Sequence, residues 1–309
     1  MDVVSLFCGC GGLDLGFEKA GFDVVWANDI DKYAVKTYNA NFEKKAICQD
    51  IYEIDIDEIP NCDVLIGGFP CQPFSMMGEE KGFADKRGVL FFRIEEIIQA
   101  MINRGHKPAV LVFENVRNLK NHDKGRTFAK IKDILERNLN YHVYSKILNS
   151  ADFGVPQTRN RTYIVCFDKA VNFVFPQEIA LNITLQDLLE HDVEQKYYLS
   201  DKILPSILSS GTGGYFSQWK IDLPVARPLC ATMAKMHRAN QDNYVTQNGK
   251  IRRLTPRECA RLQGFPDSFV IPVSDSQAYK QFGNAVTVNV SNAIAIQIKR
   301  ALEASENEQ

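Results

Sequence analysis

A cysteine framed by two prolines is the feature of this 309-residue sequence that most suggests chemistry, and it stands in the run Gly67-Gly-Phe-Pro-Cys-Gln-Pro-Phe-Ser75. Proline fixes φ and removes a backbone donor, so this framing holds Cys71 in a rigid turn. A buried, inert cysteine is the usual alternative, but a core cysteine has no need of such framing. The pattern therefore indicates a nucleophilic thiol, because a thiolate is an intrinsically strong nucleophile.

Glu114 and a pair of arginines are the other residues whose types suit chemistry. Glu114 ends an apolar run in Phe113-Glu-Asn-Val116, and its carboxyl group is a candidate acid if it faces the cysteine. The run Gln157-Thr-Arg-Asn-Arg161 spaces two arginines by two residues, so an extended segment directs both to one side. A helix cap or a surface ion pair is the alternative for the glutamate, and a simple surface pair is the alternative for the arginines.

A glycine-rich turn, Phe7-Cys-Gly-Cys-Gly-Gly12, follows the first apolar run and precedes an amphipathic one. Such a turn lies at the carboxyl end of a parallel sheet, where ligands bind. Asp14 occupies the position at which a dinucleotide fingerprint needs glycine, which weakens a pyrophosphate interpretation and favours an adenosyl ligand. Asp29, about 20 residues further on, is predicted to accept hydrogen bonds from the ribose hydroxyls, and Asp50 to meet the adenine amino group.

These residues depend on elements that place them at one edge of a sheet. Short apolar runs alternate with amphipathic stretches over the first 115 residues, which predicts a doubly wound α/β fold with a parallel sheet. Strands are expected at 2–7, 23–27, 46–48, 63–66 and 109–113, and helices at 13–20, 32–41, 90–104 and 127–138. Two further strand-like runs, 141–148 and 161–167, complete the sheet as a hairpin-like pair.

Beyond about residue 182 the pattern changes to short polar segments that contain glycine and proline, which predicts a second, smaller, loop-rich domain. Helical patterns return at 255–263 and 287–303, and the last is apolar on one face. We expect a catalytic and cofactor-binding domain at 1–183, a second domain at 184–275, and a return of residues 276–309 to the first domain.

Charge is unevenly distributed, although the net charge of the whole chain is only −2. Residues 217–261 contain nine Lys/Arg and three acidic residues, a local charge of +6, and the rest of the chain carries −8. A positive stretch of this size fits contact with a polyanion, with a solvated basic face as the alternative. The eight cysteines include no C-x-x-C pair, so neither a zinc site nor a disulfide framework is indicated. Because there is no signal peptide and no apolar run of membrane-spanning length, we expect a cytosolic protein.

Six motifs, taken in order, resemble those of the bacterial DNA (cytosine-5)-methyltransferases of type II restriction-modification systems. They are Phe7-x-Gly9-x-Gly11-Gly12, Pro70-Cys71-Gln72, Glu114-Asn115-Val116, Gln157-x-Arg159-x-Arg161, Arg257-Glu258-x-Ala260-Arg261-x-Gln263-Gly264-Phe265-Pro266 and Gln281-Phe282-Gly283-Asn284. Together they span nearly the whole chain in the family's unpermuted order. The region from about 184 to 249 matches none of them, and the family has its variable target-recognition region there. Met77 and Ala285 stand where relatives often carry serine, a departure that concerns a minor hydrogen bond.

The resemblance implies a Rossmann-like, S-adenosylmethionine-dependent fold that methylates carbon 5 of a cytosine flipped out of duplex DNA. Carbon 5 of cytosine is a poor nucleophile, so Cys71 would first add to carbon 6 and make carbon 5 enamine-like. Glu114 would donate to ring N3 and stabilise the charge that the addition creates. Arg161 would hold the cytosine carbonyl and orient Glu114, and Arg159 belongs to the same expected catalytic group.

Further site residues follow from the same resemblance. The expected cofactor-binding residues are Phe7, Gly9, Gly11, Gly12, Asp29, Ile30, Asp50, Ile51, Pro70 and Asn284. The expected DNA-binding residues are Gln72, Ser75, Arg227, Thr232, Lys235 and Arg238, and no metal is expected. The run 75–88 is polar and contains three glycines, which predicts a loop that closes over DNA and excludes water.

Two alternatives remain for the function. A tRNA cytosine-5 methyltransferase on the same fold would share the cofactor and nucleophile, although the distinct recognition region and Gln72 favour DNA. A non-catalytic DNA-binding module is opposed by the intact set of Cys71, Glu114, Arg159 and Arg161. We expect a monomer, associated with the nucleoid of a bacterial cell, that protects host DNA from a paired restriction endonuclease.

Overall fold

Residues 1–69, 90–209 and 219–307 are described by the computed structural model, and the chain divides into two compact units. The first unit contains Met1–Leu148, Asn160–Gln177 and Val290–Gln309. The second unit contains Asn149–Arg159 and Glu178–Asn289. The first unit therefore holds the expected sheet, and the second unit holds the region that matches no family motif.

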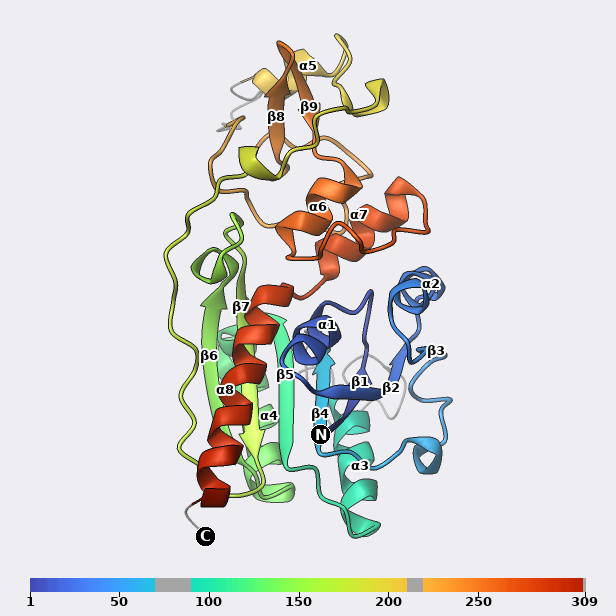
Figure 1. Ribbon diagram of the computed structural model, residues 1–309, viewed down its shortest axis with the longest axis vertical. Coiled ribbons are helices and arrows are strands. Elements are labelled where there is room, and N and C mark those ends of the chain that lie inside the picture. Colours follow the sequence, from blue (N-terminus) through green and yellow to red (C-terminus); the bar gives the residue numbers. More distant parts are fainter. Residues whose placement is uncertain (70–89, 210–218, 308–309) are drawn as a thin grey trace. The chain divides into compact units, whose positions relative to one another are not determined.

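Among the described residues, the first unit is built on a seven-stranded sheet (Figure 1). Its strands are β1 (Asp2–Leu6), β2 (Asp23–Asp29), β3 (Ile47–Cys48), β4 (Val64–Gly68), β5 (Val110–Val116), β6 (His142–Asn149) and β7 (Asn160–Phe167). The order across the sheet is β3-β2-β1-β4-β5-β7-β6. Neighbours from β3 to β5 are parallel, and β7 runs antiparallel to β5. The predicted α/β fold class is confirmed.

Continuous apolar runs explain the inner strands. The side chains of Val3 and Val4 in β1, and those of Val64, Leu65 and Ile66 in β4, have no exposed surface. Strands that are buried on both faces need such runs, and the β-branched residues Val and Ile pack well on a pleated surface. The central strands are therefore local features that the sequence encodes directly.

Helices cover both faces of the sheet (Figure 1). They are α1 (Gly12–Lys19), α2 (Lys32–Asn41), α3 (Leu90–Asn103), α4 (Arg126–Asp133) and α8 (Val288–Asn307). Apolar residues of α3 and α4 join the core cluster on one face of the sheet. In Figure 1, α1 and α8 lie in front of the sheet, and the Ser291 hydroxyl of α8 donates to the Leu13 carbonyl of α1 at 2.6 Å. The helix expected at 127–138 occurs as α4 followed by a π-helical turn, Ile134–Asn138.

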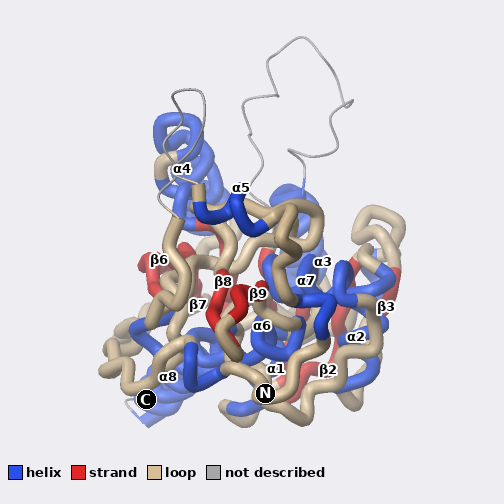
Figure 2. The backbone as a smooth tube through the Cα atoms, turned by 90° about the horizontal axis from the view of Figure 1, so that it is seen from above, coloured by secondary structure: helices blue, strands red, loops and turns tan. Residues whose placement is uncertain are grey.

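Loops make up most of the second unit, as the tan tube in Figure 2 shows. Its regular elements are α5 (Leu204–Leu208), β8 (Tyr244–Gln247), β9 (Lys250–Arg253), α6 (Pro256–Leu262) and α7 (Asp275–Asn284). Short 3-10 turns occur in the chain at Ile56–Glu58, Arg117–Lys120, His122–Gly125, Ser150–Phe153, Gln186–Leu188 and Gln195–Tyr197. No helix in the described part of the chain is long and apolar enough to cross a membrane.

The start of α6 follows from a local sequence signal. The Thr255 hydroxyl accepts from the Glu258 backbone N–H, the Glu258 carboxylate accepts from the Thr255 N–H, and Pro256 occupies the first turn. This capping box satisfies two backbone donors that a helix start otherwise leaves unpaired, and proline suits the first helical position. The predicted helix at 255–263 is therefore confirmed.

The hairpin of β8 and β9 and the helices α5 and α7 of the second unit were not predicted. Strands β8 and β9 form an antiparallel hairpin joined by Asn248 and Gly249, whose φ angles are 52° and 73°. An Asn-Gly pair between two strands is the strongest short-range signal for a hairpin, since both turn residues need positive φ. Helix α7, which contains the Gln281–Asn284 motif, was likewise read only as a motif. The hairpin and α7 both had a usable signal in the sequence, since the buried residues Ala278, Tyr279 and Phe282 of α7 repeat with helical spacing.

Candidate active site

The carboxyl ends of four neighbouring strands lie in register along one edge of the sheet. Leu6 of β1 pairs with Asn28 of β2 and Gly67 of β4, and Gly67 in turn pairs with Phe113 of β5. The segments that follow these positions contain the glycine-rich turn, Asp29, Phe69 and Glu114. The strand order reverses between β1 and β4, and such a switch point at the carboxyl ends is where doubly wound sheets bind ligands.

The glycine-rich turn needs its glycines for two different reasons. Gly9 and Gly11 have φ angles of 58° and 90°, which side chains rarely adopt. A Cβ at Gly11 would lie 2.2 Å from the ring of Phe42, so the turn packs closely on α2. No atom lies within 4 Å of a Cβ placed on Gly9, so there is open space above this residue. A ligand can therefore approach the backbone at Gly9 closely.

Asp29 holds this turn against the end of β2. Its Oδ2 accepts from the Gly9 N–H at 2.8 Å, and its Oδ1 accepts from the Asp31 N–H at 2.7 Å. A carboxylate has about four acceptor sites, so it can accept hydroxyl donors in addition to these two bonds. The next residue, Ile30, exposes 68% of its surface although it is apolar. A fixed carboxylate beside an exposed apolar side chain fits the ribose and the base of an adenosyl group.

The segment after β3 carries Asp50 and Ile51. The Asn28 amide donates to the carbonyls of Ile47 and Gln49, at 3.2 and 2.8 Å, and so holds this segment beside β2. Asp50 is half-buried and accepts from the Tyr52 N–H at 3.1 Å. Ile51 is 3% exposed and belongs to the core cluster, so its side chain packs inward. The contact of both residues with a cofactor stays a prediction.

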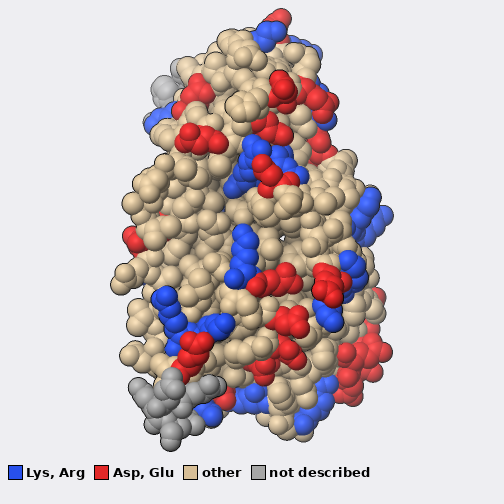
Figure 3. Space-filling view, in the orientation of Figure 1, with Lys and Arg blue, Asp and Glu red and all other residues tan. Residues whose placement is uncertain are grey.

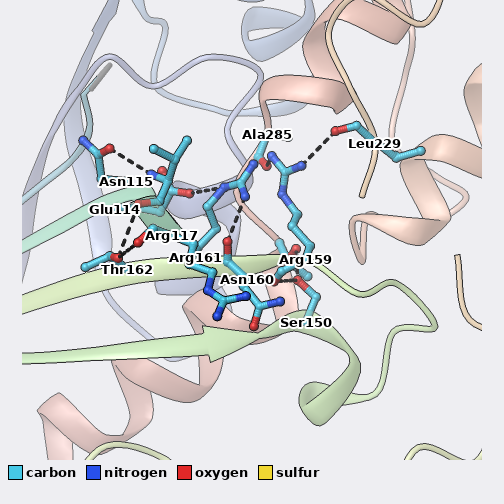
Figure 4. Close-up of polar contacts among 12 residues, drawn as sticks. Glu114, Asn115, Arg117, Ser150, Arg159, Asn160, Arg161, Thr162, Leu229 and Ala285 are labelled. Carbon is cyan, nitrogen blue, oxygen red and sulfur yellow. Dashed lines mark hydrogen bonds and ion pairs between the residues drawn. The ribbon is translucent and has the colours of Figure 1, made fainter. Parts of the chain in front are cut away.

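Glu114 and Arg161 form an ion pair across β5 and β7, with Arg161 Nε 3.1 Å from Glu114 Oε1 (Figure 4). The register pairs Glu114 with Tyr163 and Val116 with Arg161, so the two charged residues are diagonal neighbours on one face of the sheet. Their side chains are 10% and 20% exposed. The carboxylate is thus oriented by a cation and only slightly exposed.

Asn115 connects β5 to the cysteine segment. It is 2% exposed, and its amide donates to the Phe69 carbonyl at 2.8 Å. Phe69 stands two residues before Cys71, so Asn115 fixes the point at which the chain leaves β4 towards the cysteine. The predicted site residues Pro70, Cys71, Gln72 and Ser75, and the predicted loop 75–88, lie outside the described residues.

Five of the described cysteines are poor candidates for a nucleophile. They are buried, and burial raises the pKa of each thiol, to about 12 for Cys10 and Cys62. The other three are Cys8, Cys166 and Cys259, whose pKa values are also raised by burial. Because the thiolate is the reactive form, these five are inert at neutral pH.

Arg159 has surroundings quite different from those of Arg161. It precedes β7 and is 1% exposed, and its guanidinium donates to backbone carbonyls of Leu229, Gly283 and Ala285 (Figure 4). An i, i+2 pair points to one side only where both residues lie in one extended strand. Because β7 begins at Asn160, strand alternation does not govern the direction of Arg159.

The arginines expected to bind DNA have partners inside the second unit. Arg227 donates to the carbonyls of Ala239 and Asp242, and Arg238 pairs with the Asp242 carboxylate at 3.0 Å and donates to the Thr232 hydroxyl. Lys235 is exposed.

Arginines with internal partners and exposed lysines also make up the whole basic stretch at 217–261. Each of its six arginines has a hydrogen-bond acceptor within the second unit, and these arginines are 227, 238, 252, 253, 257 and 261. Its three lysines, 220, 235 and 250, are exposed. On the face shown in Figure 3, Lys and Arg occur in small groups among Asp and Glu. The local charge of +6 is therefore not a uniformly free basic surface.

Asp14, which departs from the dinucleotide fingerprint, is also a buried titratable residue, and its burial was not predicted. Asp14 of α1 has no exposed surface, and its Oδ1 accepts from the Tyr38 hydroxyl at 3.1 Å. Burial raises the pKa of Asp14 to about 7. The signal was available, because Asp14 lies between Leu13 and Phe17 on the apolar face of an amphipathic helix.

Comparisons with known proteins agree with this geometry. The family described as C-5 cytosine-specific DNA methylase matches residues 1–300. The type II methyltransferase M.NlaX of Neisseria lactamica is 45% identical over 98% of this chain and 97% of its own length. The type II methyltransferase M.HaeII of Haemophilus aegyptius is 44% identical over 94% of this chain and 91% of its own.

Solved structures show the same fold. The Dnmt2 methyltransferase of S. pombe superposes with a TM-score of 0.80 at 22% identity, and the alignment covers 97% of this chain and 99% of that one. The predicted family and the predicted DNA (cytosine-5)-methyltransferase activity are confirmed. The chain belongs to the C-5 cytosine-specific DNA methylase family.

Proposed function

We propose that this enzyme methylates a cytosine that it has flipped out of a specific duplex DNA sequence, through a covalent bond between Cys71 and carbon 6. The observation that carries the proposal is the Glu114–Arg161 ion pair, which lies at the sheet edge where Asn115 holds the segment leading to Cys71. An oriented acid, a cation and a cysteine are the groups that nucleophilic addition to a cytosine ring requires.

The chemical roles follow from the electronics of the ring. The Cys71 thiolate forms a bond to carbon 6, and the electron pair moves into the ring towards N3. Glu114, in its protonated form, donates to N3 and neutralises this charge, while Arg161 holds the carboxyl group and the cytosine carbonyl. Carbon 5 would then bond to the methyl carbon as the methyl–sulfonium bond breaks and S-adenosylhomocysteine leaves. Loss of the C5 proton to water would form the C5–C6 double bond and expel the thiolate, and N3 would return its proton to Glu114.

S-adenosylmethionine supplies the methyl group as a sulfonium, and the family and fold imply this cofactor. The open space at Gly9, the fixed Asp29 carboxylate and the exposed Ile30 side chain support binding of its adenosyl part. Asp50 would accept from the adenine amino group. The predicted contacts of Phe7, Gly11, Gly12, Ile51, Pro70 and Asn284 complete the proposed cofactor site.

Base flipping is proposed because carbon 6 of cytosine cannot be reached within a stacked duplex. The pair of Glu114 and Arg161 is only 10% and 20% exposed, which suits a single extruded base better than an intact helix. The predicted roles of Gln72 and Ser75 in DNA contact are part of this proposal.

The region 184–249 would recognise the DNA sequence, within a domain at 184–275 flanked by catalytic segments at 1–183 and 276–309. Since Arg227 and Arg238 have internal partners, they would shape the loop 232–242, whereas the exposed Lys235 would contact phosphate. Exchange of 184–249 for the same region of a relative should change which cytosine is methylated. An unchanged methylated sequence would contradict this assignment.

The relatives named as type II methyltransferases support a role in restriction-modification, in which this enzyme protects DNA from a paired endonuclease. It would act as a monomer on chromosomal DNA in the bacterial cytosol. Bisulfite sequencing of DNA from cells that express the chain tests the proposal. We expect one short sequence to be methylated at every occurrence, and no such sequence in cells that express Cys71→Ser.

Two further assays separate the alternatives. Methylation of duplex DNA and of tRNA should be compared under equal conditions, and transfer to tRNA alone would replace the proposed substrate. A duplex with 5-fluorocytosine at the target should trap a covalent complex, because fluorine cannot leave as the C5 proton does. Binding without a trapped complex would indicate a DNA-binding module.

A further inference from the structure

Arg159 is a buried cation whose donors are directed at backbone carbonyls of the second unit. It is 1% exposed. Its Nη1 donates to the Leu229 carbonyl at 3.1 Å, and its Nη2 donates to the carbonyls of Gly283 and Ala285 at 3.0 and 2.9 Å (Figure 4). Burying a charge is costly unless its donors are satisfied, so the guanidinium depends on these acceptors as they depend on it.

Gln157 binds Leu229, one of the residues that Arg159 contacts, from a second direction. It has no exposed surface, its Oε1 accepts from the Leu229 N–H at 2.9 Å, and its Nε2 donates to the Leu262 carbonyl at 2.7 Å. Both backbone polar groups of Leu229 are thus bound by side chains of one short segment, 157–159. The backbone adds to this, since Thr158 N–H donates to the Ala226 carbonyl at 2.8 Å.

The two segments that Arg159 binds also touch each other. A Cβ placed on Gly283 would lie 2.3 Å from the backbone nitrogen of Ala231, so the end of α7 packs directly on residues 230–231. Gly283 and Ala285 are buried, whereas Asn284 between them is exposed. Arg159 therefore holds the backbone carbonyls on both sides of the exposed Asn284.

We infer that Arg159 is a positioning residue that couples the DNA-recognition segment at Leu229 to the segment around Asn284, and not a group that contacts the target base. The inference rests on the proposed function, which assigns DNA recognition to 184–249 and cofactor contact to Asn284. One guanidinium serves both segments. Ordering of one segment by its ligand therefore lowers the cost of ordering the other, which makes cofactor binding and DNA discrimination interdependent.

Arginine is required for this task because its planar fork donates in several fixed directions. Lysine carries the same charge but presents it as a point on a flexible stem, so it cannot reach carbonyls of two segments at once. Arg159→Lys thus keeps the charge and removes the cross-connection. Gln157→Met is the matched control, since it releases the Leu229 N–H and the Leu262 carbonyl but leaves Arg159 bound to the carbonyls of 229, 283 and 285.

The first experiment measures binding of S-adenosylhomocysteine by calorimetry, DNA discrimination between specific and unrelated duplexes, and kcat at saturating substrates. For Arg159→Lys we expect the affinity for S-adenosylhomocysteine and the discrimination between duplexes each to fall about tenfold, the effect of one lost charged hydrogen bond. The kcat should stay within about threefold of the wild-type value. Gln157→Met should lower discrimination alone. A kcat reduced more than about a hundredfold with both affinities unchanged would identify Arg159 as a catalytic group and overturn the inference, as would no change at all.

The second experiment needs no variant, so it decides the question even if Arg159→Lys fails to fold. Hydrogen exchange of the wild-type chain is measured with and without S-adenosylhomocysteine. We expect slower exchange in peptides that cover 281–287 and also in those that cover 226–233, in the absence of DNA. Protection of 281–287 alone would overturn the coupling.

The same data separate this inference from the proposed function. Absence of protection at 281–287 would mean that Asn284 does not contact the cofactor, which is a failure of the proposed cofactor site. In that case the discrimination of the folded variants decides the inference, and unchanged discrimination in both Arg159→Lys and Gln157→Met would overturn it.

Discussion

Arg161 Nε lies 3.1 Å from Glu114 Oε1, and the two residues are diagonal neighbours on the antiparallel strands β7 and β5. In this position Arg161 holds the Glu114 carboxyl group through Nε, and its Nη1 donates to the Asn160 carbonyl at 2.9 Å. The orientation of the acid is thus set by the register of two strands.

Substitution of Glu114 by glutamine should lower kcat by about two to four orders of magnitude, the usual contribution of a positioned acid. The amide keeps the shape of the side chain but cannot transfer a proton to N3. DNA affinity should stay within about threefold, because the change removes an interaction that strengthens as charge develops. Single-turnover methylation and DNA-binding assays provide the measurements, with Arg126→Lys, at an exposed ion pair with Asp123, as a control. Retention of a tenth of the wild-type kcat would contradict the role of Glu114.

Cys71→Ser should abolish methyl transfer and retain specific DNA binding, because a hydroxyl is a far weaker nucleophile than a thiolate. Cys48→Ser is the matched control, since Cys48 is exposed at the end of β3. The control should keep full activity. Methylation by Cys71→Ser at more than a few per cent of the wild-type rate would remove Cys71 from the mechanism.

Asp29→Ala should weaken S-adenosylhomocysteine binding by roughly 1.5 to 3 kcal/mol, the value of lost hydrogen bonds to a charged group. The change removes the proposed ribose acceptor and the bond to the Gly9 N–H. Glu58→Ala, at an exposed acid outside the proposed site, serves as the control for net charge. Calorimetry measures both affinities, and equal values for the two variants would show that the ribose is held elsewhere.

Asp14 should make folding stability depend on pH. Burial raises its pKa from 3.8 to about 7, so between these values the folded state holds one proton more than the unfolded state. The free energy of unfolding therefore falls as pH rises through this window and levels off above it. Asp14→Asn should remove this part of the slope. The free energy of unfolding of the variant, minus that of the wild type, should therefore be larger at pH 8 than at pH 4.

Urea unfolding at several pH values between 4 and 8 tests this prediction. Subtraction of the variant curve from the wild-type curve cancels the other titrating groups. Parallel curves would mean that Asp14 has the same pKa in the folded and unfolded states.

Lys235→Ala should weaken binding of all DNA sequences by a similar factor and lower the slope of log K against log salt by roughly one unit. The reason is that an exposed lysine at a phosphate releases about one counterion. Lys299→Ala, an exposed cation on α8, is the control. Fluorescence anisotropy over a range of salt concentrations measures the slope, and a sequence-dependent loss for Lys235→Ala would assign it to base contact instead.

Arg238→Ala should act differently, because it removes the bonds to Asp242 and Thr232 that close the loop 232–242. Discrimination between specific and unrelated duplexes should fall by about 1 to 3 kcal/mol, with little change in the salt slope. A variant that loses one unit of slope and keeps its discrimination would place Arg238 at a phosphate.

Much of the sheet and the family could be predicted because the signals are local. Strands such as Val64–Gly68 are continuous apolar runs, and the Thr255–Glu258 capping box starts α6 within four residues. The glycines at 9 and 11, which have positive φ, are also a short-range pattern. Residue type and spacing along the chain were sufficient for each of these, because the physical constraint acts on neighbouring residues.

The partners of Arg159 and Arg161 were decided by the tertiary structure alone. Arg159 and Arg161 are the same residue type two positions apart, but one binds a carboxylate and the other binds carbonyls 70, 124 and 126 residues along the chain. A carbonyl acceptor carries no residue signature, and a diagonal pair depends on the register between strands. The sequence therefore determined the family and the reactive residue types, whereas the folded chain decided which arginine meets the acid and which one holds the segments together.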